Sequence, residues 1–323
     1  ALMAEMGREP VKTFSIGFEN PRYDETDYAR MVARHCGTDH AQETVRPNVL
    51  EILPELAWHY DEPFGDSSAI PTYYVSQIAR RRVKVVLTGD GGDECFAGYP
   101  RYVAAQIANL FDRLPRPLRA VADLGLWDRL PGAGRAKTLP RRLRRLMLGL
   151  RLPPGQRYAD WISMFNGNLR RRLLHPEMQK TLETEPEQFL AGAYREAADS
   201  SAVQQVTYAD LMSYLPCDLL NKVDIASMAH GLEARSPFLD HKVIETAGKI
   251  PAAYKLRPSS RGLETKFVLK KTFGHLLPRP VLTRRKMGFG VPMGDWFRGK
   301  LKGLLHDIIL SPRATGRGYF VTE

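Results

Sequence analysis

Residues 83–94 join a buried-strand pattern to an acidic, glycine-rich loop, and they constrain the fold more than any other stretch. Residues 83–87 (VKVVL) form a short, mainly β-branched apolar run, which is typical of a strand buried on both faces. Residues 88–94 (TGDGGDE) follow directly and contain three glycines and three carboxylates. A buried parallel strand delivers such a loop to the carboxyl edge of an open α/β sheet, where ligands bind. The alternative interpretation is a calcium-type acidic loop or a solvated turn.

The segments before this stretch alternate between strand and helix patterns. Residues 12–18 and 38–45 have strand character, whereas residues 25–36, 50–59 and 70–81 have helical periodicity. Strands and helices that alternate at this spacing predict a parallel sheet with crossover helices. The fold class is therefore α/β in this part of the chain.

After residue 99 the sequence is largely helical. Helices are predicted over residues 102–114, 139–150, 186–198, 202–214, 219–230 and 263–273. The Pro/Gly-rich residues 130–140 indicate an insertion rather than a clean domain boundary.

Composition narrows the class of protein. The chain has 323 residues, of which 43% are hydrophobic and 26% charged, as in ordinary globular proteins with a sizeable core. No apolar run is long enough to span a bilayer, and residues 1–30 carry no secretory signal pattern. The three cysteines, Cys36, Cys95 and Cys217, form no CxxC pair, which favours a reducing compartment. We therefore expect a cytoplasmic protein.

The formal net charge is +11, and much of the excess lies in four basic clusters. These clusters are residues 80–82, 141–145, 170–172 and 284–286. They could attract nucleic acid or a polyphosphate. No helix-turn-helix, RNA-recognition or zinc-finger pattern accompanies them, so we interpret them as solvated helix faces and expect no nucleic-acid partner.

Both ends of the chain lack the usual boundaries of an element. Residues 1–6 (ALMAEM) have the pattern of the middle of an amphipathic helix, with no cap before it. Residues 318–323 stop without a terminating element. We expect the chain to be a fragment of a longer protein.

Two loops carry candidate binding groups. Residues 60–69 are rich in hydroxyls and carboxylates, including Ser67 and Ser68, and they precede a predicted helix. The start of that helix could be an anion cradle or simply an N-cap loop, and the local pattern favours neither. Residues 284–290 form a basic loop broken by glycines, which could fold over a phosphate or remain solvated.

Three segments together resemble one known family. Residues 12–18, 88–94 (TGDGGDE) and 231–240 (GLEARSPFLD) are similar, in order and spacing, to the synthetase domain of glutamine-hydrolysing asparagine synthetase. The resemblance covers nearly the whole chain. It implies an adenine nucleotide α-hydrolase-like fold of the PP-loop ATPase type, with a parallel sheet flanked by helices and a largely α-helical C-terminal portion.

The resemblance also implies a domain plan and a reaction. The parts would be a nucleotide-binding α/β core over residues 1–100, a mainly helical insertion over residues 101–218 and a helical remainder over residues 219–323. ATP would activate the side-chain carboxylate of aspartate as β-aspartyl-AMP, with release of pyrophosphate. Ammonia from a separate glutaminase domain would then displace AMP and give asparagine. ATP and Mg²⁺ are the expected cofactors, a homodimer is the expected assembly, and no membrane partner is expected.

Residue roles follow from the same resemblance. Ile16 matches the strand position whose backbone meets adenine, and Thr88 and Gly89 match the pair that contacts the nucleotide. Lys266 matches the lysine that meets the phosphates or the developing charge. Cationic groups are needed there because adenylation moves negative charge onto the leaving pyrophosphate.

The acidic residues of the loop have their own implied roles. Asp93 and Glu94 match the acidic pair near Mg²⁺-pyrophosphate, with Asp93 as the metal ligand and Glu94 on the substrate side. Asp90 stands where the family usually has Glu, at a catalytic position that also faces the substrate. An aspartate keeps the charge but moves the carboxylate by roughly 1.5 Å. It could accept a proton from the attacking ammonia.

The chain also departs from the family. The Ser-Gly-Gly-x-Asp-Ser pyrophosphate loop, the strand before it and the glutaminase domain are absent from this sequence. We therefore expect the chain alone to bind ATP poorly and to turn over little or nothing. Ser67 and Ser68, our candidate substrate contacts, stand in place of a Thr/Arg-containing substrate loop.

These departures leave alternatives open. One is a relative that amidates or cyclises another carboxylate, such as a sugar acid, a peptide or a β-lactam precursor. Another is a PP-loop-like protein that binds or modifies RNA, which predicts salt-sensitive RNA binding.

Overall fold

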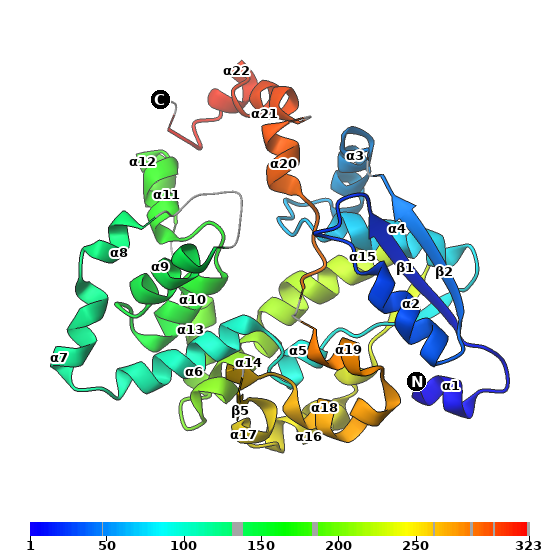
Figure 1. Cartoon of the computed structure of the whole chain (residues 1–323). Coiled ribbons are helices and arrows are strands. Elements are labelled where there is room, and N and C mark those ends of the chain that lie inside the picture. The colour runs from blue at the N-terminus through cyan, green and yellow to red at the C-terminus, as the bar shows by residue number, and fades with distance from the viewer. Residues whose placement is uncertain are drawn as a thin grey trace. The chain divides into compact units, whose positions relative to one another are not determined.

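The computed structural model describes residues 1–46, 48–130, 138–182, 187–260, 262–284, 287–299 and 301–321. The chain divides into two compact units, and each unit combines segments that are far apart in sequence (Figure 1). Unit 1 contains Ala1–Gly98 and Tyr214–Met293, and unit 2 contains Tyr99–Ser213 and Gly294–Glu323. Three consecutive domains are expected from the sequence, over residues 1–100, 101–218 and 219–323. The two compact units do not follow these bounds, and the three domains stay a prediction.

Unit 1 contains three short pairs of strands and the helices around them. Its elements are α1 (Leu2–Met6), β1 (Lys12–Phe18), α2 (Thr26–His35), β2 (Asp39–Val45), α3 (Val49–Tyr60), α4 (Ala69–Arg80), β3 (Val85–Leu87), α5 (Gly92–Cys95), η2 (Leu215–Leu220), α15 (Asn221–Met228), β4 (Glu233–Arg235), η3 (Pro237–Leu239), α16 (His241–Lys249), α17 (Ala252–Lys255), β5 (Arg257–Ser259), β6 (Gly262–Glu264), α18 (Phe267–Phe273), η4 (Gly274–Leu276) and α19 (Arg279–Thr283).

The first parallel pair confirms the strand–helix alternation read from the sequence. β1 and β2 run parallel in a register that pairs Ile16 with Glu43, and α2 lies beside β1 (Figure 1). Ile16 and Phe18 are buried, as are Ile70 and Ile78 of α4, which packs against β1. Burial of these apolar side chains is the main stabilising contribution that the strand pair receives.

The second parallel pair corrects one expectation. β3 pairs with β4 in parallel, but Val85 and Leu87 are 41% and 56% exposed, so the strand is not buried on both faces. In the described part of the chain, β4 is the only strand that pairs with β3, and it is three residues long. The sheets are thus small, β5–β6 is an antiparallel pair, and the fold is mixed α/β.

Predicted and observed helix bounds differ at several places, and the helix predicted over residues 219–230 is divided between η2 and α15. The helix predicted over residues 263–273 begins only at Phe267, because β5 and β6 form a hairpin that ends at Glu264. The helix predicted over residues 186–198 is seen from Glu187 to Glu196, and residue 186 lies outside the described residues.

The described residues of unit 2 are helical, as the sequence predicts beyond residue 99, apart from one antiparallel bridge between Leu174 and Phe320. Its helices are α6 (Pro100–Asp112), α7 (Arg116–Arg119), η1 (Ala120–Asp123), α8 (Leu126–Arg129), α9 (Leu139–Gly149), α10 (Pro154–Ile162), α11 (Gly167–Leu173), α12 (Pro176–Lys180), α13 (Glu187–Glu196), α14 (Ala202–Met212), α20 (Met293–Arg298), α21 (Lys302–Ile309) and α22 (Pro312–Thr315).

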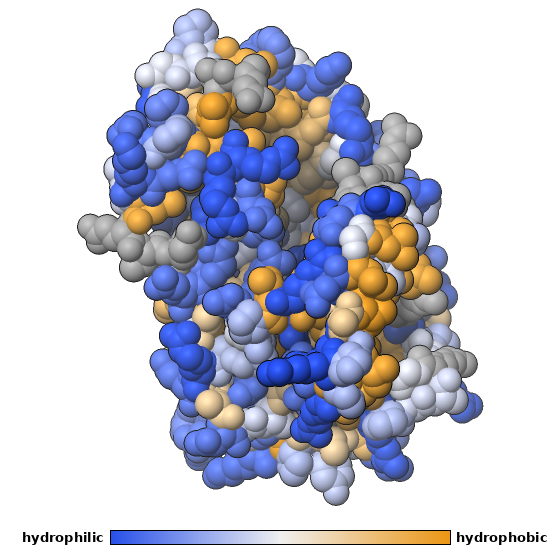
Figure 2. All heavy atoms as spheres, turned by 90° about the vertical axis from the view of Figure 1, so that its left-hand side faces the viewer, coloured by the Kyte–Doolittle hydropathy of each residue, from blue (hydrophilic) through white to orange (hydrophobic). Residues whose placement is uncertain are grey.

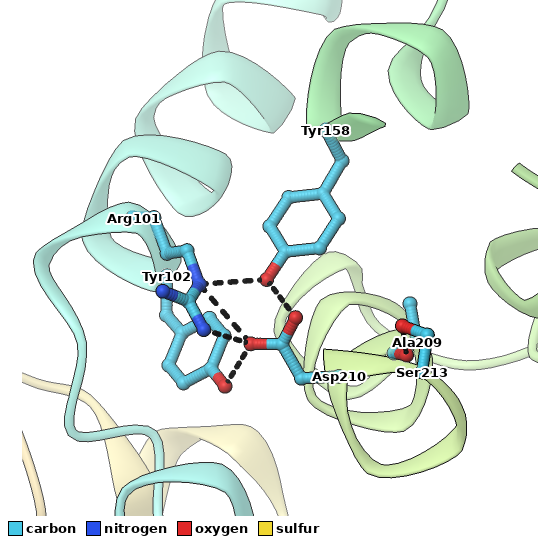
Figure 3. A network of polar contacts seen from close by, with 6 residues as sticks. All are labelled: Arg101, Tyr102, Tyr158, Ala209, Asp210 and Ser213. Carbon is cyan, nitrogen blue, oxygen red and sulfur yellow. Dashed lines mark hydrogen bonds and ion pairs between the residues drawn. The ribbon is translucent and has the colours of Figure 1, made fainter. Parts of the chain in front are cut away.

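A buried carboxylate connects three helices of unit 2 (Figure 3). Asp210 of α14 is fully buried and accepts hydrogen bonds from Tyr158 of α10 at 2.7 Å and from Tyr102 of α6 at 2.5 Å. The Arg101 guanidinium donates to the same carboxylate at 2.6 and 3.1 Å. Burial, together with the Asp210 charge, raises the pKa of both tyrosines well above its ordinary value, so both phenols remain donors.

The basic clusters are partly neutralised within each unit. Arg81 pairs with Glu43 at 2.8 Å, Arg82 with Asp39 at 2.5 Å, and Arg170 with Glu187 at 2.5 Å. Figure 2 views the side on which Figure 1 draws α7 and α8, and it shows strongly hydrophilic side chains beside exposed apolar ones. Among the exposed apolar residues of unit 2 are Leu118 and Leu126. No helix in the described ranges has the length and apolar character needed to cross a bilayer.

Removing the Asp210 carboxylate should destabilise unit 2, because the Arg101 charge would lose its buried partner. We expect Asp210→Ala to lower the free energy of unfolding by about 3–5 kcal/mol. Lys180→Ala is the matched control, because Lys180 forms a well-exposed ion pair with Glu177, and it should cost at most about 1 kcal/mol. Urea denaturation of the protein that contains this chain measures the unfolding free energy of both variants. Equal losses in Asp210→Ala and Lys180→Ala would contradict the stabilising role of the buried Asp210 carboxylate.

His40 of β2 lies between two hydroxyl groups of β1. Its Nδ1 is 2.9 Å from Thr13 Oγ1, and its Nε2 is 3.0 Å from Ser15 Oγ. Burial lowers the pKa of His40, and the Arg30 charge lowers it further. The folded state therefore favours the neutral ring.

This lowered pKa predicts a pH dependence of stability. Between the ordinary histidine pKa of about 6.5 and the lower folded pKa of His40, the unfolded chain binds a proton that the folded chain does not. Stability should therefore fall as the pH drops through this window, and His40→Gln should reduce the dependence. Urea denaturation over a pH series tests this, and an unchanged slope in His40→Gln would contradict it.

Candidate functional site

The acidic glycine loop is held against a segment that lies about 150 residues further along the chain. The Thr88 N–H donates to the Arg235 carbonyl at 2.8 Å and thereby extends the β3–β4 pairing. The Thr88 and Ser236 hydroxyls are hydrogen-bonded at 2.5 Å. Residues 88–94 and 231–240, which the sequence analysis singled out separately, are therefore neighbours in space.

A glycine is required within this loop. Gly91 has φ +83°, a conformation that side-chain-bearing residues rarely adopt. A Cβ at this position would lie 2.2 Å from Leu239 Cδ2. The close approach of the loop to residues 237–239 thus depends on the missing side chain.

An ion pair joins the loop to Lys266. Asp93 of α5 lies with its Oδ1 3.0 Å from Lys266 Nζ, and both side chains are mostly shielded from solvent. The Gly98 backbone covers this pair. A Cβ on Gly98 would lie 1.9 Å from Asp93 Oδ1 and 2.4 Å from Lys266 Cε. A glycine at position 98 is therefore necessary for this arrangement of the two charges.

Lys266 has an unusual backbone. Its φ of 53° and ψ of 32° are left-handed, and it is the residue directly before α18. A non-glycine residue in this region costs about 1–2 kcal/mol, and such residues are concentrated at functional sites. The conformation lies at the junction between the β5–β6 hairpin and α18, where Lys266 meets Asp93.

Several buried ionisable groups lie in α5 or interact with it. Glu94 and Cys95 are almost fully buried. Burial raises the pKa of the Cys95 thiol to about 11, and the Glu94 charge contributes in the same direction. Lys255 of α17 is 2% exposed, and burial lowers its pKa, while the Cys95 group counteracts this effect. Sequence reasoning missed Lys255, because a single lysine in a short amphipathic segment carries no distinctive signal.

The two candidate serines have different surroundings. The Ser68 hydroxyl donates to Asp66 Oδ2 at 2.6 Å and accepts from Lys222 Nζ at 2.8 Å, so its hydrogen bonds are made within the protein. Ser67 is half-buried, and its side chain makes no hydrogen bond to another described residue. Sequence reasoning did not find Asp66 or Lys222, whose ion pair joins positions far apart in the chain.

The structure thus brings together some of the predicted residues. Thr88, Gly89, Asp90, Asp93 and Glu94 belong to one loop, and Lys266 reaches this loop through its ion pair with Asp93. Asp90 is half-buried, and Gly89 is exposed. Ile16 is buried in the separate β1–β2 pair, and no hydrogen bond or strand pairing among the described residues joins it to the loop.

The basic loop of residues 284–290 is described in part. Arg284 forms an ion pair with Glu25, whereas residues 285 and 286 lie outside the described residues. Within the described part of the chain, no three His, Cys, Asp or Glu side chains converge on a position that could hold a metal. A Mg²⁺ ion needs fewer protein ligands, because one or two carboxylates and the substrate phosphates suffice. Asp93, whose side chain is 14% exposed, could supply one such carboxylate, whereas Glu94 is almost fully buried.

Nearly the whole chain is similar in sequence to known proteins. The sequence model of a family described as asparagine synthase matches residues 1–323. The glutamine-hydrolyzing asparagine synthetase 1 of Bacillus subtilis (strain 168) is 31% identical over 303 residues, which cover 93% of this chain and 45% of that protein. A putative glutamine-hydrolyzing asparagine synthetase of Mycobacterium bovis is 35% identical over 291 residues, covering 88% of this chain and 42% of the relative.

A more distant relative has a different name. Amidase chyE of Penicillium rubens is 22% identical over 337 residues, which cover 96% of this chain and 48% of that protein. The chain spans less than half the length of each of these three relatives. Because the family model matches the chain from end to end, and relatives above 30% identity match about nine-tenths of it, the chain belongs to the asparagine synthase family.

Proposed function

We propose that this chain is part of an ATP-dependent amide-forming ligase, and that it activates the side-chain carboxylate of aspartate as β-aspartyl-AMP. Ammonia derived from glutamine then gives asparagine, AMP and pyrophosphate. The observation that supports this most strongly is the ion pair between Asp93 and Lys266, which lies under Gly98 beside the glycine loop. The parallel pairs β1–β2 and β3–β4 are compatible with a PP-loop type of sheet.

Charge placement suits the first step. A carboxylate oxygen of the acceptor attacks the α-phosphorus of ATP, and the bond to the leaving pyrophosphate breaks. The Lys266 ammonium would stabilise the negative charge that moves onto that leaving group. Asp93 holds Lys266 in place and would bind Mg²⁺ through its carboxylate, and Glu94 is the proposed residue on the substrate side. When bound, Mg²⁺ would neutralise phosphate charge.

The second step forms the amide. The ammonia nitrogen attacks the acyl carbon, the bond to AMP breaks, and nitrogen loses a proton. Asp90 is the candidate for accepting that proton, because its half-buried carboxylate lies on the loop beside Gly89. Thr88, Gly89 and Ile16 are the proposed nucleotide contacts, and Ser67 the proposed acceptor contact.

The rest of the reaction concerns the longer protein. The relatives of more than twice this length are named as glutamine-hydrolyzing, so we propose that a further part of the protein supplies ammonia. A cytoplasmic homodimer remains our expectation for the whole protein.

A second acceptor class follows from two observations. The family resemblance implies that Asp90 stands where a longer glutamate is usual, and a distant relative is named an amidase. A ligase of the same mechanism that amidates another carboxylic acid is therefore the second candidate.

The acceptor can be identified by pyrophosphate release. We expect the full-length protein to release pyrophosphate from ATP when aspartate is added, because the adenylate forms before ammonia attacks. The family position that Asp90 matches is tied to formation of the adenylate as well as to its capture, so Asp90→Asn, which removes the carboxylate charge, should abolish acceptor-dependent release. Release with another carboxylic acid but not with aspartate would establish the second candidate, and normal release by Asp90→Asn would contradict the role of Asp90.

A methyl group at position 98 tests the ion pair. Gly98→Ala places a Cβ into the space of Asp93 Oδ1 and Lys266 Cε, so the two charges must separate. Displacement of reacting groups by about 1 Å costs about 100-fold in rate, and we expect a loss of this order in acceptor-dependent pyrophosphate release. Gly248→Ala is the control, because a Cβ at position 248 has no neighbour within 4 Å. Equal rates in the two variants would show that the pair is not needed.

A further inference from the structure

A buried lysine connects α15 to the loop that precedes α4. The Lys222 side chain is 8% exposed, and its Nζ donates to Asp66 Oδ2 at 2.9 Å and to Ser68 Oγ at 2.8 Å. Positions 66 and 222 are 156 residues apart in sequence, so this contact fixes the loop from outside its own segment. We call Asp66, Ser68 and Lys222 the clamp.

The clamp is closed by hydrogen bonds within the loop. The Ser68 hydroxyl donates to Asp66 Oδ2 at 2.6 Å, and the Ser68 N–H donates to Asp66 Oδ1 at 2.9 Å. Both carboxylate oxygens of Asp66 are therefore engaged. The Ser68 carbonyl in turn accepts from the Thr72 hydroxyl at 2.8 Å, which ties the loop to the first turn of α4.

The other end of the loop is also attached to α15. The Tyr60 hydroxyl, at the end of α3, donates to the Lys222 carbonyl at 3.0 Å. The Tyr60 ring stacks on Phe64 with centroids 4.4 Å apart. Residues 60–68 are thus held at both ends by the same lysine, through its backbone and through its side chain.

Electrostatics favours the charged form of the clamp. Burial alone raises the pKa of Asp66, but the Lys222 charge and the hydrogen bonds from Ser68 outweigh burial and lower the pKa overall. A buried ion pair of this kind adds little net stability over apolar packing, although loss of one partner is costly. Its main effect is to fix the positions of the groups it joins, because charged hydrogen bonds are short and geometrically selective.

Ser67 lies between the two loop residues that the clamp holds. Its half-buried side chain has no hydrogen-bond partner among the described residues. A hydroxyl group that is positioned from both sides and not engaged by the protein is suited to meet a polar group of a ligand.

We propose that Lys222 is a positioning residue for the acceptor, because its clamp on Asp66 and Ser68 fixes where the Ser67 hydroxyl meets the carboxylic acid substrate. This inference rests on the proposed ligase function, and it adds that the clamp determines how the ligase holds its carboxylic acid acceptor. ATP binding does not depend on the clamp.

The experiment compares Lys222→Met, Lys222→Arg and unsubstituted full-length protein. Met keeps much of the side-chain volume but has no charge, whereas Arg can still donate to Asp66. Hydrogen–deuterium exchange is measured on peptides from residues 60–68. KM values for the acceptor and for ATP are measured by pyrophosphate release, with whichever carboxylic acid supports release. Lys180→Met is the control, because its ion pair with Glu177 is exposed and lies in unit 2.

We expect Lys222→Met to raise the acceptor KM and the exchange of residues 60–68 by about tenfold each, as the loss of a charged hydrogen bond implies. The ATP KM should stay within about twofold, and Lys222→Arg should recover most of the acceptor KM. If Lys222→Met does not fold, Asp66→Asn removes the charged partner of Lys222 and should raise the acceptor KM but not the ATP KM.

Two outcomes would overturn the inference: unchanged exchange of residues 60–68, or an equal rise in both KM values. The proposed function fails separately, if unsubstituted protein releases no pyrophosphate with any carboxylic acid. In that case the exchange of residues 60–68 alone decides whether the clamp exists.

Discussion

The parallel pairing of β3 with β4 is the constraint on which the candidate site depends. It joins residues 85–87 to residues 233–235, and the Thr88–Arg235 hydrogen bond continues it into the acidic loop. Such a contact closes a chain loop of about 150 residues, which has an entropic cost that only cooperative packing can offset. Packing of α15 against α4 and β4 provides part of that support. The Asp93–Lys266 ion pair is a further contact between distant parts of the same unit.

Local sequence patterns predict where strands and helices lie better than they predict the burial and pairing of those elements. Residues 12–18 were expected to form a strand, and β1 has those bounds, because alternation and β-branching are local properties. β3 was expected to be buried on both faces, but the described strands give it only one neighbour. The apolar run gives no information about how many strands will pair with it. The helix that begins at Phe267 rather than at residue 263 reflects the β5–β6 hairpin, which competes for the same residues.

The candidate site was predictable where its residues are adjacent in sequence. The loop over residues 88–94 carries its own signal in its glycines and carboxylates, whereas Lys222 and Lys255 do not stand out from other lysines. Their environments depend on residues far along the chain, such as Asp66 for Lys222 and Cys95 for Lys255. Membership of the asparagine synthase family adds an expected chemistry, but the relatives are more than twice as long as this chain.

The left-handed backbone of Lys266 has a consequence for the evolution of this site. Glycine would adopt the same conformation without steric cost, so a chain selected only for folding would have glycine at this position. Lysine gives up that stability and in return places an ammonium group beside Asp93. Position 266 is therefore a point where thermostability and the proposed activity oppose each other. Sequence changes that stabilise the domain by relaxing this turn would remove the charge that the proposed chemistry uses.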